Sequence, residues 1–111
     1  MNKYLVTYHA PAETMNDKSK MTQENMNKYM ELWKIWTEKC GSALVDLGTP
    51  LGFGQNVVNT GQEASNRNTC GFSILQAENM DSAKLLLEGH PHLAWDQTCD
   101  IQIYQQMQMP G

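Results

Sequence analysis

The chain has 111 residues, with 8 basic and 12 acidic side chains and a formal net charge of −4. This length fits a single domain over residues 1–111, and 41% hydrophobic against 18% charged residues excludes a disordered chain. Arg67 is the only arginine and no basic stripe is present, so nucleic-acid binding is not expected. The apolar run after Met1 is too short for a signal peptide or a membrane span, and we expect a cytoplasmic location without membrane contact.

The cysteines Cys40, Cys70 and Cys99 are widely separated and form no C-x-x-C pair. A zinc site built from thiolates is therefore not expected, and we predict free thiols that pack as small apolar groups. The sequence also has no glycine-rich phosphate loop and no Ser-His-Asp signature. We therefore predict no cofactor.

Residues 3–9 are predicted to form the first strand, because they include strand-favouring types such as Tyr4, Val6 and Tyr8. Their nearly continuous apolar character indicates that both faces of this strand are covered. The Ala10-Pro11-Ala12 segment ends the strand, and the polar residues up to about Met21 are predicted to be a loop.

A long helix is predicted next, capped by Thr22 and ending near Leu47, because Gly48 and Pro50 are typical stop signals. Gly41-Ser42 is expected to mark a bend inside it. Apolar residues recur at the helical period and predict one buried face: Met26, Tyr29, Met30, Trp33, Trp36, Cys40, Leu44 and Leu47, widened by Leu32 and Ile35.

Two further strands are predicted at residues 53–60 and 69–77. The residues between them, 61–68, are polar and predict a turn. We therefore expect these two strands to pair as a hairpin.

A second helix, capped by Asn79 and ended by Gly89, and a last strand over residues 98–107 complete the chain. The order strand, helix, strand, strand, helix, strand predicts an α+β, ferredoxin-like βαββαβ fold: a four-stranded antiparallel sheet with two helices on one face. Because the other face has no cover within the chain, we expect a homodimer.

Several segments together resemble the YCII-related family, and the resemblance covers nearly the whole chain. They are Lys3-Tyr4-Leu5-Val6, the run Leu44 to Leu51, the strand Gly71 to Glu78 and Gly89-His90-Pro91-His92. The closing Met109-Pro110-Gly111 is similar to the end of a small branch of that family. The resemblance implies a ferredoxin-like protomer that pairs into a dimeric α+β barrel.

Members of the family have been proposed to be enzymes that use a His–Asp pair on the first helix. In this chain Met30 and Lys39 stand opposite those positions. Neither side chain can perform the chemistry of His or Asp, so the family's proposed catalytic pair does not transfer. Acid–base groups must come from elsewhere in this chain.

His90 and His92 are the first candidates. In extended chain, which the intervening proline favours for His90, both imidazoles would point to the same side and relay a proton near neutral pH. Alternatively, they complete the end of the second helix, or they bind a metal. A metal would need a third ligand, from His9, Asp96 or Asp46.

The other candidates are aromatic or lie at element ends. Trp33 and Trp36 form either an aromatic wall for a flat ligand or ordinary core, and the helical stripe favours core. Trp95 is predicted in a loop, where it lines a pocket or fills a dimer contact. Tyr8 and His9 end the first strand, and either is a candidate acid or base.

Asp46 is unusual because a carboxylate is disfavoured near a helix C-terminus. We therefore count it with Tyr8, Trp36 and Trp95 as a candidate ligand-binding residue, beside the simpler interpretation of a solvated acid.

These features favour a small cofactor-free enzyme that transfers protons on a small organic molecule, in an isomerisation or elimination, with His90, His92 or His9 as the proton-transfer group. Two alternatives fit the same sequence: a non-catalytic small-molecule binding module that uses the same cleft, and a structural homo-oligomer without a ligand.

Overall fold

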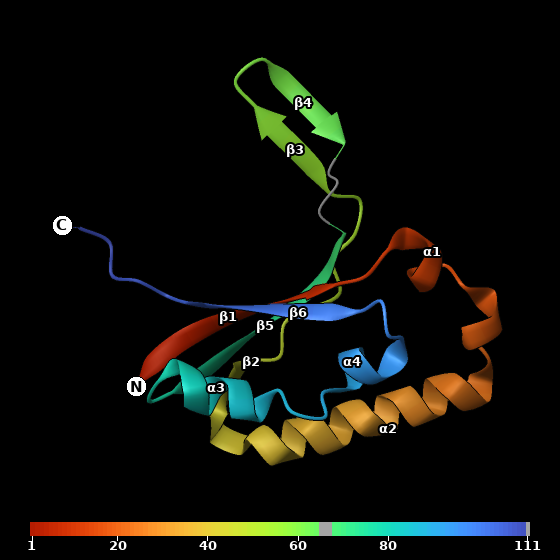
Figure 1. Cartoon of the computed structure of the whole chain (residues 1–111), viewed down its shortest axis with the longest axis horizontal. Helices are drawn as coiled ribbons and strands as arrows, with labels where there is room; N and C mark the ends of the chain where they lie inside the picture. Colours follow the sequence, from red (N-terminus) through yellow and green to blue (C-terminus); the bar gives the residue numbers. More distant parts are fainter. Residues whose placement is uncertain (65–67, 111) are drawn as a thin grey trace.

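The main sheet has four antiparallel strands: β1 (Asn2–His9), β2 (Leu44–Asp46), β5 (Thr69–Ala77) and β6 (Asp100–Gln105). The structure is a computed structural model that describes residues 1–64 and 68–110. The strand order is β2-β5-β1-β6 (Figure 1), which is the ferredoxin-like order. The predicted α+β class is confirmed.

The helices α2 (Gln23–Cys40), α3 (Met80–Leu86) and α4 (Pro91–Trp95) lie on one side of this sheet (Figure 1). The stretch predicted as a loop before α2 contains the short helix α1 (Ala12–Met15) and the 3₁₀ turn η1 (Lys18–Lys20). No helix in the described part of the chain is long and apolar enough to span a membrane.

Both predicted helix caps are confirmed, but the predicted end of the long helix is wrong. The Thr22 hydroxyl accepts a hydrogen bond from the Asn25 amide, and the Asn79 side chain accepts one from the Ser82 amide. α2 ends at Cys40, because Gly41 follows in the left-handed region with φ +53° and a short 3₁₀ turn, η2 (Gly41–Ala43), redirects the chain.

The edge strand β2 explains this error. Leu44 and Leu47 continue the helical spacing of apolar residues by coincidence, because they belong to β2 and the loop after it. Asp46 therefore lies on an edge strand and not at a helix end. It is exposed, and its Oδ1 accepts a hydrogen bond of 2.8 Å from the Gly48 amide.

The predicted hairpin between residues 53–60 and 69–77 is also wrong. β3 (Gln55–Val58) pairs with β4 (Gly61–Ala64) in a separate two-stranded sheet, and β5 pairs with β2 and β1. Residues 61–64 of the predicted turn thus form strand β4. Residues 65–67 of the predicted turn lie outside the described residues. The weak strand signal of 53–60, with its glycine and polar side chains, marks an excursion away from the sheet.

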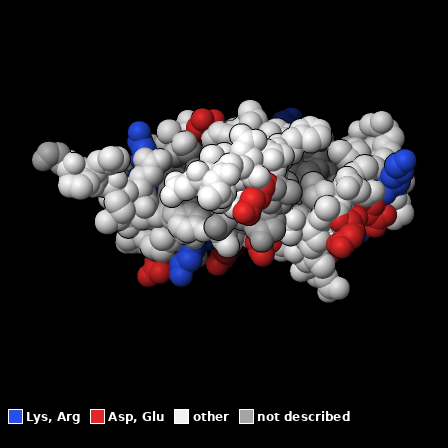
Figure 2. All heavy atoms as spheres, turned by 90° about the horizontal axis from the view of Figure 1, so that it is seen from above, with Lys and Arg blue, Asp and Glu red and all other residues white. Residues whose placement is uncertain are grey.

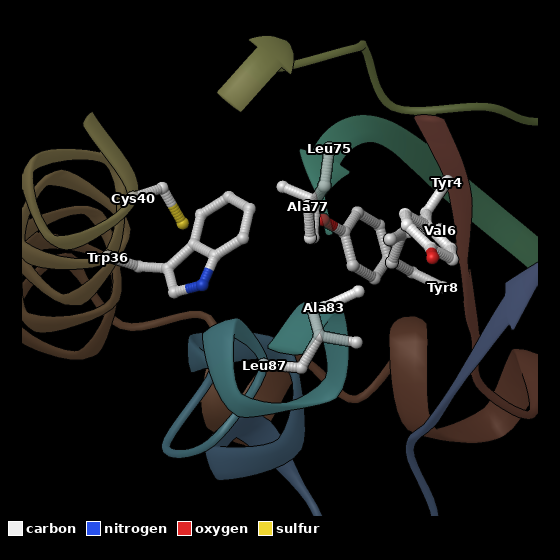
Figure 3. Close-up of a cluster of buried hydrophobic side chains, with 9 residues drawn as sticks. All are labelled: Tyr4, Val6, Tyr8, Trp36, Cys40, Leu75, Ala77, Ala83 and Leu87. Carbon is white, nitrogen blue, oxygen red and sulfur yellow. The ribbon is translucent and has the colours of Figure 1, made fainter. Parts of the chain in front are cut away.

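Alternation along β1 defines two faces of the sheet. Tyr4, Val6 and Tyr8 are buried toward the helices, whereas Leu5 and the residues that alternate with the buried ones are only partly buried. The helix-facing side chains form the core with Leu75, Ala77, Ala83, Leu87, Trp36 and Cys40 (Figure 3). β1 is therefore covered on one face within this chain, and the predicted cover of its other face would have to come from a second subunit.

The apolar stripe of α2 is narrower than its sequence predicts. Trp36 and Cys40 are buried, whereas Met30, Leu32 and Ile35 are exposed. The helix thus contacts the core along a thin strip, and spacing alone cannot distinguish its buried apolar residues from the exposed ones.

The loop after β2 is held against β5. Gly48 has φ +78°, and a Cβ atom there would lie 1.8 Å from the carbonyl oxygen of Phe72. The Leu51 amide then donates a hydrogen bond to the Cys70 carbonyl, and Pro50 forms an isolated bridge with Gly71. Only glycine allows this close approach of two backbones.

The side of the sheet opposite the helices is open, and the β3–β4 hairpin projects away from it (Figure 1). Viewed from that side, charged side chains lie mainly around the edges, and most of the surface between them is uncharged (Figure 2). The radius of gyration is 15.6 Å, whereas a compact chain of this length has about 13 Å. The projecting hairpin and the extended C-terminal segment both contribute to this expanded shape (Figure 1).

Candidate functional site

A buried hydrogen-bond network joins His90 to three other elements. His90 is the N-cap of α4, and its Nδ1 accepts a hydrogen bond of 2.9 Å from the His92 amide. The neutral ring therefore carries its proton on Nε2, which donates to the Tyr8 hydroxyl at 3.2 Å. Because Ser73 donates to the Leu47 carbonyl at 2.6 Å, Tyr8 in turn donates to Ser73 at 2.6 Å.

His90 has the extended backbone that the following proline favours, with φ −58° and ψ 138°, but the extended shape does not continue to His92. Pro91 opens a short helix, as prolines at the first helical position commonly do, and the two imidazoles make different hydrogen bonds. The predicted bond of one histidine to backbone is made by His92, but the side chain of His90 caps the N-terminus of α4 and does not complete the end of the second helix.

The His90 ring is fully buried and surrounded by aromatic rings. Its centroid lies 4.4 Å from that of Trp36, 4.8 Å from that of Trp33 and 4.9 Å from that of Tyr8. Burial, together with the smaller effects of nearby His92 and Lys39, lowers the pKa of His90 to about 3. His90 is therefore neutral at physiological pH.

Tyr8 and Trp36 are equally enclosed. Burial raises the pKa of Tyr8 to about 12, although its hydrogen bond with Ser73 opposes the shift. The Trp36 indole N–H donates to the Leu86 carbonyl at 2.8 Å. These side chains make up core and internal network, and neither lines a hollow of the surface.

His92 supports the end of β1 from the helix side. It is 3% exposed, and its Nε2 donates a hydrogen bond of 2.9 Å to the backbone carbonyl of His9. Burial lowers the pKa of His92, while the carbonyls of His9 and Asp100 act in the opposite direction. His92 thus fixes the backbone at the His9–Asp100 pair, where β1 meets β6.

His9 lies on the open face of the sheet and lines a hollow of about 170 Å³, which we call the His9 hollow. Its Nε2 hydrogen-bonds the Thr7 hydroxyl at 2.7 Å, and its Nδ1 lies 3.3 Å from the Thr69 hydroxyl. The other residues that line the hollow are Ala10, Pro11, Asn68, Thr98, Asp100 and Gln102. Of the three histidines, His9 alone borders this hollow.

The His9 hollow is rich in groups that can bind oxygen atoms of a ligand. Gln102 and Asn68 carry amides, and Asp100 is the cross-strand neighbour of His9, whereas the Thr98 hydroxyl already donates to Asp96. An imidazole beside a carboxylate and several polar groups can transfer a proton and stabilise the charge that develops.

The remaining predicted site residues lie elsewhere. Asp46 is on β2, and Trp95 borders a second hollow between α2 and α4. Within residues 1–64 and 68–110, no three His, Cys, Asp or Glu side chains are grouped closely enough to hold a metal ion. The three cysteines are free.

Sequence reasoning missed the polar partners of His9 and of Tyr8. Thr7 follows from the strand period, since residues two apart share a face. Asp100, Gln102 and Ser73 required the register between strands, which nothing in the sequence alone fixes.

The fold and its open face together place the chain among α+β proteins with the ferredoxin-like strand order, the protomer fold of dimeric α+β barrels. No protein-family model matches the sequence, and no curated protein matches it.

A solved structure is similar over 100% of this chain and 96% of its own, with a TM-score of 0.52 and 16% identity. It is 5-chloro-2-hydroxyhydroquinone dehydrochlorinase (TftG) from Burkholderia phenoliruptrix AC1100, in complex with 2,5-dihydroxybenzoquinone. At this identity the likeness establishes the fold and leaves the function open.

Proposed function

We propose that the protein is a small, cofactor-free enzyme that transfers protons on a small, oxygen-bearing organic molecule, in an isomerisation or an elimination. The observation that carries this proposal is the position of His9, a partly buried imidazole held by two threonines at the wall of a polar hollow. The structural likeness to a dehydrochlorinase in complex with a benzoquinone supports this chemistry as one option for the fold.

The three histidines take different roles in this proposal. His9 removes a proton from a carbon of the substrate and returns it to another atom, as general base and then general acid. His92 holds the backbone of His9 through its hydrogen bond to the carbonyl. His90 organises the buried network beneath, since its ring is fully buried and does not line the His9 hollow.

The polar groups of the hollow complete the proposed mechanism. Loss of a proton from carbon leaves negative charge on a neighbouring oxygen atom of the substrate. The side-chain amides of Gln102 and Asn68 belong to the lining and can donate hydrogen bonds to that oxygen. In an elimination, the electron pair of the broken C–H bond then forms the double bond as the leaving group departs.

We also propose that the active form is a homodimer in which the open faces meet. Leu5, Phe72 and Ile74 are only partly buried on that face, and Tyr104 is 51% exposed. Such an apolar layer is normally covered by a third layer or by a second subunit. Face-to-face pairing would also enclose the His9 hollow and exclude water from it.

Membership of the YCII-related family and a cytoplasmic location belong to the same proposal. The family is supported by the sequence segments that resemble it and by the ferredoxin-like strand order. The location is supported by three free cysteines, which are usual in a reducing compartment.

The test is proton exchange with solvent. Small cyclic ketones, lactones and halogenated dihydroxybenzenes are incubated with the protein in deuterated water, and deuterium incorporation or halide release is followed by NMR. For any molecule that reacts, we expect His9→Gln to slow the reaction by at least about 100-fold, because its amide can keep the threonine contacts but cannot carry a proton.

His90→Asn is the matched comparison, since asparagine keeps an N-cap acceptor on α4. It should retain most of the exchange rate. Equal rates in His9→Gln and wild type would refute the role of His9. Saturable binding in the hollow with no exchange in the wild type would instead show a binding module.

A further inference from the structure

A second hollow lies in the helix layer, between η1, the N-terminal half of α2 and α4. Its volume is about 280 Å³, and its lining includes Lys20, Asn25, Lys28, Tyr29, Leu32 and Trp95. We call it the Trp95 hollow. It shares no lining residue with the His9 hollow, so a ligand bound there would be independent of the proposed function.

One wall of the Trp95 hollow is aromatic and apolar. The rings of Tyr29 and Trp95 lie 4.6 Å apart at an angle of 61°, and both side chains are only partly buried. Leu32 beside them is 41% exposed. Flat ring surfaces and an exposed leucine around a concave space favour a planar apolar ligand body.

The indole nitrogen of Trp95 adds a polar requirement. It is buried, and it has no hydrogen-bond partner among residues 1–64 and 68–110. Buried donors in folded proteins are normally paired, so an N–H group without an acceptor beside a hollow is an unusual feature. A ligand acceptor would reach this nitrogen only after the Trp95 ring turns, because the nitrogen itself is inaccessible.

The lining also contains two lysines, Lys20 and Lys28. Lys20 donates to Asp96 and to the Trp95 carbonyl, which hold its ammonium group at the rim. Lys28 is paired with Glu24 at 3.2 Å, but both side chains are largely exposed, so this pair is weak and Lys28 can turn toward a ligand.

Asp96 neutralises Lys20 through their ion pair, which leaves Lys28, in its exposed pair with Glu24, as the cation for a ligand. The Oδ1 atom of Asp96 accepts hydrogen bonds from the amide and hydroxyl of Thr98, and its Oδ2 accepts from Lys20, so the carboxylate is fully engaged. Asn25 adds an amide that can donate to an anion.

We propose that the Trp95 hollow binds a small aromatic carboxylate, with its ring against Tyr29 and Trp95 and its carboxylate toward Lys28 and Asn25. The volume lies just below the roughly 300–1,000 Å³ of sites for drug-sized ligands, which fits one substituted ring.

The test uses benzoate as the probe and the indole N–H signal of Trp95 as the readout. We expect a saturable shift of that signal in proton–nitrogen NMR spectra, and a weaker response to neutral benzamide. Lys28→Gln should weaken benzoate binding by about 2- to 5-fold, the range expected for an exposed charge contact. Lys34→Gln, an exposed lysine on the same helix outside the hollow, should leave it unchanged.

Removing the aromatic wall provides a second variant. Tyr29→Leu should weaken benzoate binding by about 2- to 10-fold, within the range for one aromatic contact. His9→Gln should bind benzoate as the wild type does, which separates this site from the His9 hollow. No saturation at tens of millimolar benzoate, equal binding of benzamide, or equal effects of Lys28→Gln and Lys34→Gln would overturn the proposal.

Discussion

The buried neutral imidazole of His90 predicts a specific loss of stability in mild acid. Its pKa is about 3 in the folded chain, against an ordinary value of 6.5 in the unfolded chain. Below pH 6.5 the His90 imidazole is therefore protonated in the unfolded state, whereas in the folded state it stays neutral until the pH approaches 3. The stabilisation is complete above pH 6.5 and is lost as the pH falls from 6.5 toward 3.

The magnitude follows from the interval between these two values. At pH 5 the unfolded imidazole is 1.5 pH units below its ordinary pKa of 6.5, and each unit corresponds to about 1.36 kcal/mol. The folded ring is still unprotonated at that pH. His90 alone should therefore lower the free energy of unfolding by roughly 2 kcal/mol between pH 8 and pH 5.

The assay is urea unfolding at both pH values, at one fixed protein concentration, for wild type and His90→Asn. Asparagine can still cap α4 but does not titrate. We expect the pH-dependent loss to be smaller in the variant by about 2 kcal/mol, whatever its absolute stability. If both proteins lose the same free energy over this range, His90 is not a buried neutral group and the network that fixes its tautomer is wrong.

Four further substitutions probe the fold. Gly48→Ala should destabilise the protein by roughly 2 kcal/mol or more in urea unfolding, because its Cβ would meet the Phe72 carbonyl. Gly41→Ala is the control: this glycine also has a positive φ but has open space around it, so the substitution should cost only about 1 kcal/mol. Equal costs would contradict the close approach of Gly48 to Phe72. Thr22→Ala removes a helix cap and should cost about 1 kcal/mol in the same assay, and an unchanged midpoint would show that the cap contributes nothing. Tyr8→Phe leaves the Nε2–H group of His90 without an acceptor and should lower the free energy of unfolding by about 1–3 kcal/mol. The NMR signal of that N–H group should also move. A substitution that changes neither the stability nor this signal would argue against the hydrogen-bond network.

The sequence predicts the fold class well because an error in the boundary of one helix or strand does not change the order of the main helices and strands along the chain. The caps at Thr22 and Asn79 are local interactions between a side chain and a nearby amide, so they can be read from the sequence. The end of α2 is misplaced by the apolar pattern because Leu44 and Leu47 mimic helical spacing after Gly41. Strand β2 is only three residues long, too short to show a period of its own.

The candidate site is harder to predict than the fold because it depends on register. The sequence identifies His9 from its place at a strand end, but its neighbours Asp100 and Gln102 reach it only through pairing of β1 with β6. The short helix after His90 also escapes prediction, since a proline that opens a helix resembles a stop signal in the sequence. Tertiary contacts decide both features.

The open face of the sheet is the surface on which the proposed function depends, because it carries the His9 hollow and lacks a covering layer in one chain. Sedimentation equilibrium of the purified protein measures directly whether a second copy covers it. We predict the mass of two chains at micromolar concentration, with dissociation only on strong dilution. A mass of one chain at every concentration would contradict a dimer formed through this face.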